Sequence, residues 1–501
     1  MLSEKDIIQL EGLGMLTDQI YRQIDNFKVG FPPIDLVKPA TVNDGIIKLE
    51  CYEVDDLIEI YKSYEGVRLK FVPASGAATR MFEALIKYTT TGENNASVEE
   101  FVLNLCKFPF YNDLKEELSK KGLSPNELIQ QENFKPIIDA LLDANGLNYG
   151  SLPKGLIKFH RYNDYARTAF EEQLIEGTQY ARMPNNEVSI HLTVSPEHLD
   201  NFKGILNSIS PEICKEYDVK LNVTFSEQNK CTDTIAVDNS NIPIRDSEGN
   251  LLFRPGGHGA LIQNLNKLSG DIIFIKNIDN VVPDRLKPQT VLYKKALAGL
   301  LISYQSIIFD YLSLLQSDGI GIEQLNEILD FTINELCILP PSGFEVSSTS
   351  ALKTYLHEKL NRPLRVCGMV KNEGEPGGGP FWVTNSDGTI SLQIIESSQV
   401  DKNNTNQKEI FGASTHFNPV DLICATKDVD GQKFDLLNYT DPATGFITTK
   451  SKDGREMKVQ ELPGLWNGAM AYWNTIFVEV PLATFNPVKT VLDLLRDQHR
   501  E

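Results

Sequence analysis

Apolar and polar positions follow two different periods along the chain, and this pattern predicts strands that alternate with helices. Short, mostly apolar runs at 69–72, 188–194, 219–225 and 271–278 have the length and residue types of buried strands. Amphipathic segments with helical spacing, such as 196–209, lie between them. Because such alternation is typical of a parallel sheet covered by helices, we expect an α/β fold.

The same pattern divides the chain into three regions. Residues 1–65 have helical periodicity and predict an N-terminal helical region. Residues 66–340 form the expected core, with a polar, helix-rich insertion at about 92–150. Residues 341–501 predict a C-terminal β-rich part that completes the core and ends in a helix over 487–498.

The charge balance narrows the class of partner. Among 501 residues, 48 lysines and arginines stand against 68 aspartates and glutamates, which gives a formal net charge of −20. A general nucleic-acid binder needs a basic surface that displaces counterions from the phosphate backbone, so this balance argues against nucleic acid. We expect small molecules as partners, and the sequence leaves the oligomeric state open.

The sequence carries no pattern of an export signal or a membrane span. Its first residues lack a basic start and a small-residue cleavage site. The most apolar long stretch, 296–315, is interrupted by polar side chains, which favours a buried helix. The seven cysteines are scattered without Cys-x-x-Cys spacing. We expect a cytoplasmic protein with free thiols and no membrane partner.

The first candidate for chemistry is a turn of small residues between the apolar run at 69–72 and a helical pattern. The turn consists of Ser75, Gly76, Ala77, Ala78 and Thr79, followed by Arg80. Small side chains let backbone amides approach phosphate oxygens, a helix N-terminus adds partial positive charge, and a guanidinium binds phosphate with two hydrogen bonds. The turn predicts a nucleotide-binding site, and a βα turn with Arg80 in solvent is the alternative.

A second candidate is Lys154, which follows Pro153 in the segment Leu-Pro-Lys-Gly. An ammonium group held behind a proline is a point charge suited to a phosphate. A surface Pro-Lys-Gly turn is the alternative.

The third candidate is a glycine-rich segment followed by an acidic strand end. Gly257, His258 and Gly259 open a helical pattern, and Asp279 ends the apolar run at 271–278. Glycines let the backbone approach a base or sugar, and Asp279 is placed to hold a divalent cation. The alternatives are a histidine hydrogen-bonded to backbone and an aspartate that caps a turn.

Taken together, these motifs resemble the sugar nucleotidyltransferases, or nucleotide-sugar pyrophosphorylases, and most of all their UDP-sugar branch. The segments that carry the resemblance are Thr-Arg-Met after a small-residue loop, Pro-Lys-Gly, Pro-Gly-Gly-His-Gly before a helix, and a strand that ends in Ile-Asp-Asn. They cover roughly 66–290, and more loosely 360–480. The whole chain is also identified as a member of an uncharacterised bacterial family, domain of unknown function 4301.

The resemblance implies a Rossmann-like, GT-A-like mixed sheet with helices on both faces, and it assigns roles. Ser75 to Ala78 would cradle the nucleotide, Arg80 would contact the triphosphate, and Lys154 would neutralise developing charge. Gly257 and Gly259 would approach base and sugar, and Asp279 would bind Mg²⁺. Ser75 and Ala78 stand where the family has glycines, and Lys154 follows Arg80 at several times the usual spacing.

Further downstream, the family's chemistry calls for more ligands. We expect Asp421 as a second metal ligand and Asn418 as a sugar contact, with a proline-fixed strand turn as the alternative. Asn467 is a further sugar candidate, against core packing of its neighbours. Arg365 and Lys371 bracket a strand and either reach the sugar phosphate or lie at a solvated strand end.

The sequence therefore predicts an enzyme that forms an NDP-sugar and pyrophosphate from an NTP and a sugar-1-phosphate with Mg²⁺. In-line attack on the α-phosphorus needs positioning and charge neutralisation rather than a protein nucleophile. Two alternatives stay open. One is a GT-A-like glycosyltransferase, although no Asp-x-Asp motif lies near Asp279. The other is a non-catalytic protein that binds a nucleotide or a sugar nucleotide.

Overall fold

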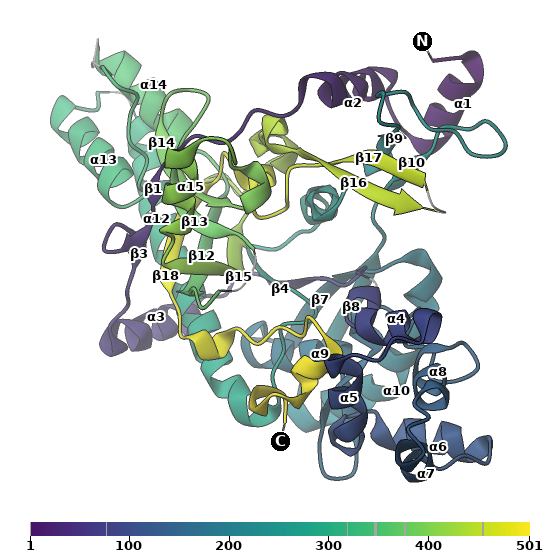
Figure 1. Ribbon diagram of the computed structural model, residues 1–501. Coiled ribbons are helices and arrows are strands. Elements are labelled where there is room, and N and C mark those ends of the chain that lie inside the picture. Colours follow the sequence, from purple (N-terminus) through teal and green to yellow (C-terminus); the bar gives the residue numbers. More distant parts are fainter. Residues whose placement is uncertain are drawn as a thin grey trace. The chain divides into compact units, whose positions relative to one another are not determined.

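The computed structural model (Figure 1) describes residues 2–76, 78–317, 319–344, 348–374, 377–452 and 455–500. The chain forms two compact units, each assembled from three segments. Unit 1 comprises Met1–Gly66, Gln228–Ile273 and Ala296–Val480, and unit 2 comprises Val67–Glu227, Phe274–Lys295 and Pro481–Glu501. The units cut across the three consecutive regions expected from the sequence, because strands pair between segments that lie far apart in the chain.

The sheet of unit 2 contains the strands that the apolar runs predict. Its strand order is β11 (Ile272–Lys276, of which residues 274–276 belong to this unit), β4 (Arg68–Pro73), β7 (Glu187–Thr193), β8 (Lys220–Ser226). β4, β7 and β8 are parallel, and α10 (Leu199–Tyr217) connects β7 to β8. α9 (Ala169–Tyr180) precedes β7 and packs closely on it, since a Cβ at Gly177 would lie 2.7 Å from Cδ1 of Ile190. The expected α/β class is confirmed.

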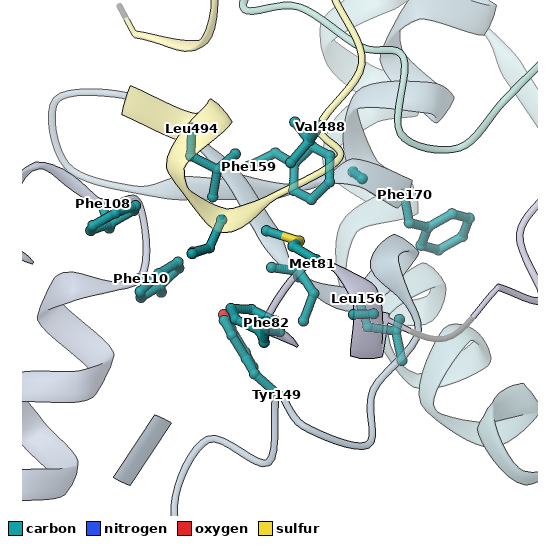
Figure 2. Packing of buried hydrophobic residues seen from close by; sticks show 14 of the residues in the cluster. Met81, Phe82, Phe108, Phe110, Tyr149, Leu156, Phe159, Phe170, Val488 and Leu494 are labelled. Atoms are coloured by element: carbon teal, nitrogen blue, oxygen red, sulfur yellow. The ribbon is translucent and has the colours of Figure 1, made fainter. Parts of the chain in front are cut away.

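The residues expected as a helical insertion form short helices that pack around aromatic side chains. After α4 (Glu83–Thr91), the helices of this part are α5 (Ala96–Leu103), α6 (Tyr111–Lys120), α7 (Pro125–Gln130) and α8 (Lys135–Leu142). Figure 2 shows Phe108, Phe110 and Tyr149 beside Phe82, which follows the small-residue turn. The rings of Phe110 and Tyr149 meet edge to face at 5.4 Å. Because the insertion packs into this core, the chain that follows the insertion lies beside the small-residue turn again.

His191 in β7 couples the stability of unit 2 to pH. Its ring nitrogens lie 2.8 Å from the hydroxyls of Thr224 and Ser226 in β8, and burial lowers the pKa of His191 from 6.5 to about 4. Because His191 has the higher pKa in the unfolded chain, it binds a proton there as pH falls below 6.5, while His191 of the folded chain stays neutral down to about pH 4. The stability that neutral His191 contributes is therefore lost as pH falls from 6.5 toward 4. Urea unfolding of wild type and His191→Gln at pH about 7 and about 5 checks this, with a smaller loss expected for the variant. Equal losses in both proteins would contradict it.

Unit 1 contains a mixed sheet and two smaller sheets. The mixed sheet has the order β2 (Thr41–Val42), β3 (Gly45–Ile47), β18 (Asn474–Glu479), β12 (Leu364–Lys371), β15 (His416–Ala425). β12 runs parallel to β18 and antiparallel to β15. One smaller sheet has the order β10 (Phe253–Arg254), β9 (Thr234–Val237), β17 (Arg455–Glu461), β16 (Phe446–Lys452), and the other has β1 (Leu36–Pro39), β13 (Gly379–Thr384), β14 (Ile390–Ile395). A mixed sheet, as expected, is confirmed.

The helices of unit 1 surround these sheets. They are α1 (Glu4–Leu13), α2 (Thr17–Val29), α3 (Cys51–Ser63), α11 (Ile262–Asn266), α13 (Ile322–Asn334), α14 (Thr349–Leu360) and α15 (Thr405–Gly412). The N-terminal region is thus not wholly helical: it also supplies β1, β2 and β3, which pair with distant partners such as β13 and β18. Such short strands carry too few residues for a visible period.

The long helix α12 (Lys287–Gln316) starts in unit 2 and continues into unit 1. By length and composition alone, the segment Asp284–Gln316 would suffice to cross a membrane, a test that core helices of soluble proteins also pass. Of the most apolar 18-residue stretch in this segment, 39% is buried inside the structure. Within unit 1, α12 packs tightly on α3, since a Cβ at Gly299 would lie 1.9 Å from the carbonyl oxygen of Leu57.

The C-terminal segment differs from the expected helix over 487–498. It forms 3₁₀ turns at Val491–Leu495 and Asp497–His499. The Asp493 carboxylate accepts the backbone N–H groups of Lys489 and Thr490, both at 2.7 Å, and so holds the chain extended before the first turn. This extended stretch includes Lys489, whose side chain contacts Asp279.

Candidate functional site

The small-residue turn and the Pro-Lys-Gly segment are joined by backbone hydrogen bonds in unit 2. The Ala78 N–H donates to the carbonyl oxygen of Leu152 at 3.1 Å, and the Lys154 N–H donates to that of Gly76 at 3.4 Å. The long spacing between Arg80 and Lys154 therefore does not separate them, because the helices between them fold into their own core. Both segments lie where β4 ends.

Within the turn, side chains differ in exposure. Ser75 is half-buried, Gly76, Thr79 and Arg80 are exposed, and Ala78 is buried, while Ala77 lies outside the described residues. Ala78 begins a 3₁₀ turn and is not among the residues with positive φ, so alanine in place of a family glycine causes no backbone strain there. Within the described chain, the Arg80 side chain makes no hydrogen bond or ion pair. Its guanidinium is free to meet an anion.

Lys154 and Asp279 form an ion pair, which a third side chain joins. Lys154 Nζ lies 2.7 Å from Asp279 Oδ2 and donates to the Val488 carbonyl oxygen at 2.7 Å. From the C-terminal segment, Lys489 Nζ lies 3.5 Å from the same carboxylate oxygen. Asp279 is largely buried, whereas about half of the Lys489 side chain, 53%, is exposed. Two ammonium groups therefore meet at one carboxylate where β11 ends.

The charge on Asp279 is stabilised by its neighbours. Burial raises its pKa, but the ammonium groups of Lys154 and Lys489 outweigh burial and bring the pKa of Asp279 below its ordinary value. The carboxylate of Asp279 therefore stays ionised at neutral pH. Sequence reasoning missed Lys489. The available signal was the segment Asn486-Pro487-Val488-Lys489, a lysine shortly after a proline, much like Lys154.

A metal site built by the protein does not emerge from these residues. Within the parts of the chain that the structure describes, no group of three or more His, Cys, Asp or Glu side chains is arranged to hold a metal ion. Asp279 Oδ2 already faces two ammonium groups, which a divalent cation on the same oxygen would oppose. Asp421 lies in unit 1, buried in β15 opposite Gly368. Mg²⁺ as a cofactor stays a prediction.

The glycine-rich segment lies in unit 1 and is packed against the strand end at 461–463. Gly257 has φ +78°, and a Cβ there would lie 2.7 Å from Oε2 of Glu461. A Cβ at Gly259 would lie 2.1 Å from the Pro463 carbonyl oxygen. Both glycines are therefore required by the fold of this loop, whatever else they contact.

His258 is held between backbone and an aromatic ring. Its Nδ1 accepts the Leu465 N–H at 3.0 Å, and its ring stacks on Trp466 with centroids 4.2 Å apart. Burial lowers the pKa of His258, while the carboxylates of Glu396 and Glu461 act in the opposite direction. One ring nitrogen thus makes the backbone hydrogen bond that the sequence left as an alternative, and a role in ligand binding stays a prediction.

Close packing at Gly259 leads to a stability prediction. In Gly259→Ala the methyl group would clash with the Pro463 backbone, which cannot move as easily as a side-chain tip. We expect a loss of about 1–3 kcal/mol in the free energy of unfolding. As a control, Gly204→Ala in α10 meets nothing within 4 Å; it should stabilise by about 0.5–1 kcal/mol. Denaturant unfolding measures both, and an unchanged stability of Gly259→Ala would refute the packing argument.

The remaining predicted residues also lie in unit 1, and their surroundings differ. Arg365 is fully buried, where its guanidinium donates to Thr475 Oγ1 at 2.9 Å and to the Trp466 carbonyl oxygen at 2.6 Å. A solvated strand end therefore does not describe it. Lys371 is exposed, with its Nζ 3.9 Å from Glu479.

Asn418 and Asn467 are both buried and incompletely hydrogen-bonded. The Asn418 carbonyl oxygen Oδ1 accepts the N–H of Val420, which has φ +57°, at a bulge in β15. Asn467 Nδ2 donates to Gln399 at 3.4 Å. Among the described residues, Nδ2 of Asn418 and Oδ1 of Asn467 have no partner. Buried polar atoms without a partner are sites where a polar ligand gains hydrogen bonds.

The structure thus brings the turn at 75–80, Lys154 and Asp279 together in unit 2, and adds Lys489 to them. The glycine-rich segment and the downstream candidates belong to unit 1. That both groups line one pocket stays a prediction.

Comparison with known proteins gives one family match and several similar structures. The model of a family described as "Domain of unknown function (DUF4301)" matches residues 3–500. No curated protein sequence matches the chain. A mutant UDP-glucose pyrophosphorylase from Leishmania major, in complex with UDP-glucose, is 13% identical, with 99% of this chain and 79% of that chain covered and a TM-score of 0.46.

Two further solved structures come from Trypanosoma brucei. A uridine diphosphate N-acetylglucosamine pyrophosphorylase in complex with an inhibitor is 12% identical, with 99% of this chain and 79% of that chain covered and a TM-score of 0.49. A UDP-glucose phosphorylase is 13% identical, with 98% and 77% covered and a TM-score of 0.45.

Proposed function

We propose that this chain, which belongs to the family described as "Domain of unknown function (DUF4301)", is a nucleotidyltransferase that forms an NDP-sugar and pyrophosphate from an NTP and a sugar-1-phosphate. The observation that carries the proposal is the meeting of Lys154 and Lys489 at Asp279, next to the turn that presents Arg80. A carboxylate between two lysines holds their side chains close together, as the binding of a polyphosphate requires.

The reaction needs no group on the protein to form a covalent bond. A phosphate oxygen of the sugar-1-phosphate attacks the α-phosphorus, the bond from that phosphorus to the bridging oxygen breaks, and pyrophosphate leaves with the electron pair. Negative charge grows on the transferred group and the leaving group. Arg80, Lys154 and Lys489 would neutralise it, and Asp279 would position the lysines.

Binding would exchange one set of contacts for another. Lys154 now donates to Asp279 and to the Val488 carbonyl oxygen. A triphosphate offers this ammonium group oxygens of higher negative charge, while the exposed Lys489 reaches the same anion from the C-terminal segment. Mg²⁺ would arrive with the NTP as part of the substrate.

For the residues of unit 1, only the resemblance to the sugar nucleotidyltransferases supports a role in the reaction. Gly257, His258 and Gly259 would face the base and sugar, and the unpartnered amide atoms of Asn418 and Asn467 would suit sugar hydroxyls. Arg365 has no assigned role in the reaction, because its guanidinium already supports the fold by donating to Thr475 and to the Trp466 carbonyl oxygen.

A pyrophosphate-release assay tests the proposal. Each of the common NTPs is mixed with each of a panel of sugar-1-phosphates and Mg²⁺, and we expect pyrophosphate only when a matched pair is present together. Lys489→Ala should abolish release. Lys203→Ala, which removes an exposed lysine of α10 in the same unit, should leave it unchanged.

Other outcomes assign other functions. The mutual pairing of Lys154 and Asp279 also suits a protein that binds a nucleotide without turning it over. Calorimetric NTP binding with no pyrophosphate from any pair would support that candidate and overturn the proposal. Consumption of an NDP-sugar without an NTP would instead indicate a glycosyltransferase.

A further inference from the structure

Unit 1 contains a pocket of about 630 Å³, and of the residues assigned to the proposed reaction only Gly259 lines it. Its walls come from α2, from Gly259–Gln263, and from chain segments within 437–443 and 460–469. α2 lies against β9 and β17 in this unit (Figure 1). Neither the turn at 75–80 nor Lys154 or Lys489 is among the lining residues. The size is that of a typical small-molecule site.

One wall is a polar stripe on α2. Gln19, Arg22, Gln23 and Asn26 line the pocket, and their spacing places them on one face of the helix. The apolar side chains Ile20, Ile24 and Phe27 pack instead into a core with strands β9 and its neighbours. An amphipathic helix normally turns its polar face to solvent, whereas here that face lines a cavity.

Two buried amides of this wall have donors to spare. Gln23 is 3% exposed, and its Oε1 accepts the Ile235 N–H at 2.9 Å. Gln460 is 5% exposed, and its Oε1 accepts from Asn26 Nδ2 at 3.4 Å. Within the described chain, neither Nε2 group has an acceptor, and both side chains line the pocket. A ligand with acceptor oxygens would satisfy them.

Most of the other lining residues are apolar and are together called the apolar wall. They include Phe31, Pro32, Ile262, Leu437, Leu462 and Pro463. The charged lining residues, Arg22 and Asp25, are exposed and of opposite sign, and Asp25 pairs with Lys28 at 2.8 Å. Because Arg22 and Asp25 are both exposed, a phosphate or carboxylate in the pocket would meet only a solvent-screened charge, which contributes little to binding.

We propose that this pocket binds an uncharged heterocycle with ring carbonyl groups, of the nucleobase or nucleoside class. The ring would lie against the apolar wall, and its carbonyl oxygens would accept from Nε2 of Gln23 and Gln460. The pocket adjoins the back of the glycine-rich loop through Gly259 and Ala260. The proposed reaction does not depend on this site: the pocket shares Gly259 with the segment assigned to the base and sugar, but neither Lys154 nor Asp279 lines it.

Binding of uridine, adenosine and guanosine by the whole protein, measured by calorimetry and ligand-observed NMR, tests the proposal. We expect at least one nucleoside to bind, and the corresponding monophosphate to bind no more tightly. Ala443→Trp, which fills the pocket from an exposed position, should weaken binding at least tenfold. Ala413→Trp, an exposed alanine of the same unit outside the lining, should not.

Two more variants separate this pocket from the proposed reaction. Gln460→Leu removes a donor and should weaken binding about tenfold, the loss of one hydrogen bond. Lys154→Ala should leave nucleoside binding unchanged. Absence of binding by all three nucleosides would overturn the proposal, as would binding that is lost in Lys154→Ala but retained in Ala443→Trp. The second result would place the base in the substrate site instead.

Discussion

Arg80→Ala is expected to lower kcat/KM of the nucleotidyl transfer by about 10²–10³-fold, the usual effect of removing one donor to developing charge. Arg80 is exposed, and its side chain makes no hydrogen bond or ion pair within the described residues. Its removal therefore takes away a ligand for phosphate oxygens without opening a gap in the fold. The thermal unfolding midpoint should stay within error of wild type.

Steady-state kinetics with the NTP and sugar-1-phosphate found in the pyrophosphate assay measure this effect. Arg161→Ala is the matched control, because Arg161 is also an exposed arginine of unit 2 and its one hydrogen bond goes to the Cys106 carbonyl oxygen. Near-normal kcat/KM in Arg80→Ala would show that the guanidinium does not face the triphosphate, and the turn at 75–80 would lose its assigned role.

Glu176→Gln should cause the largest loss of stability, about 3–5 kcal/mol, because it removes one partner of a buried ion cluster. Glu176 is fully buried in α9, with Oε2 2.8 Å from Lys276 Nζ and Oε1 3.3 Å from Lys70 Nζ. Tyr180 donates to the same carboxylate at 2.9 Å. Without the negative charge, the variant leaves buried ammonium groups uncompensated in the sheet of unit 2.

The pH dependence of that loss is a second readout. Burial lowers the pKa of Lys70 from 10.5 to about 7, against the opposing charge of Glu176. Between pH 7 and 10.5 the unfolded chain thus binds the proton more tightly than the folded chain, so stability from this group rises with pH. The deficit of Glu176→Gln should shrink at pH about 9, where Lys70 is neutral in the folded protein.

Urea unfolding at both pH values measures the free energies. Glu197→Gln, at an exposed glutamate of the same unit, is the control and should match wild type. A Glu176→Gln protein as stable as wild type at neutral pH would show that the charge of Glu176 is not needed to hold Lys70 and Lys276 in this cluster.

Long apolar runs made most of the fold of unit 2 predictable from sequence. The run at 69–72 became β4, that at 188–194 became β7, and that at 271–278 became β11, because buried strands need apolar side chains on both faces. The short strands β1 and β3 were not predictable, since they depend on partners hundreds of residues away.

The candidate site was predictable in part and for a similar reason. Lys154 and Asp279 stood out beside proline, glycine and strand-end signals, and they meet in the structure. Lys489 was hidden in a segment whose pattern indicated a helix, and only the contacts of Asp279 reveal it. The sequence marked Gly257 and Gly259 as possible ligand contacts. In the structure, glycine is needed at both positions because Glu461 and Pro463 approach them closely.

A crystal structure with Mg²⁺ and a non-hydrolysable NTP analogue would locate the triphosphate. We expect it at the end of β4, with its oxygens within hydrogen-bond distance of the Arg80 guanidinium and of Nζ of Lys154 and Lys489. A nucleotide bound elsewhere, with both lysines still held only by Asp279, would contradict this expectation.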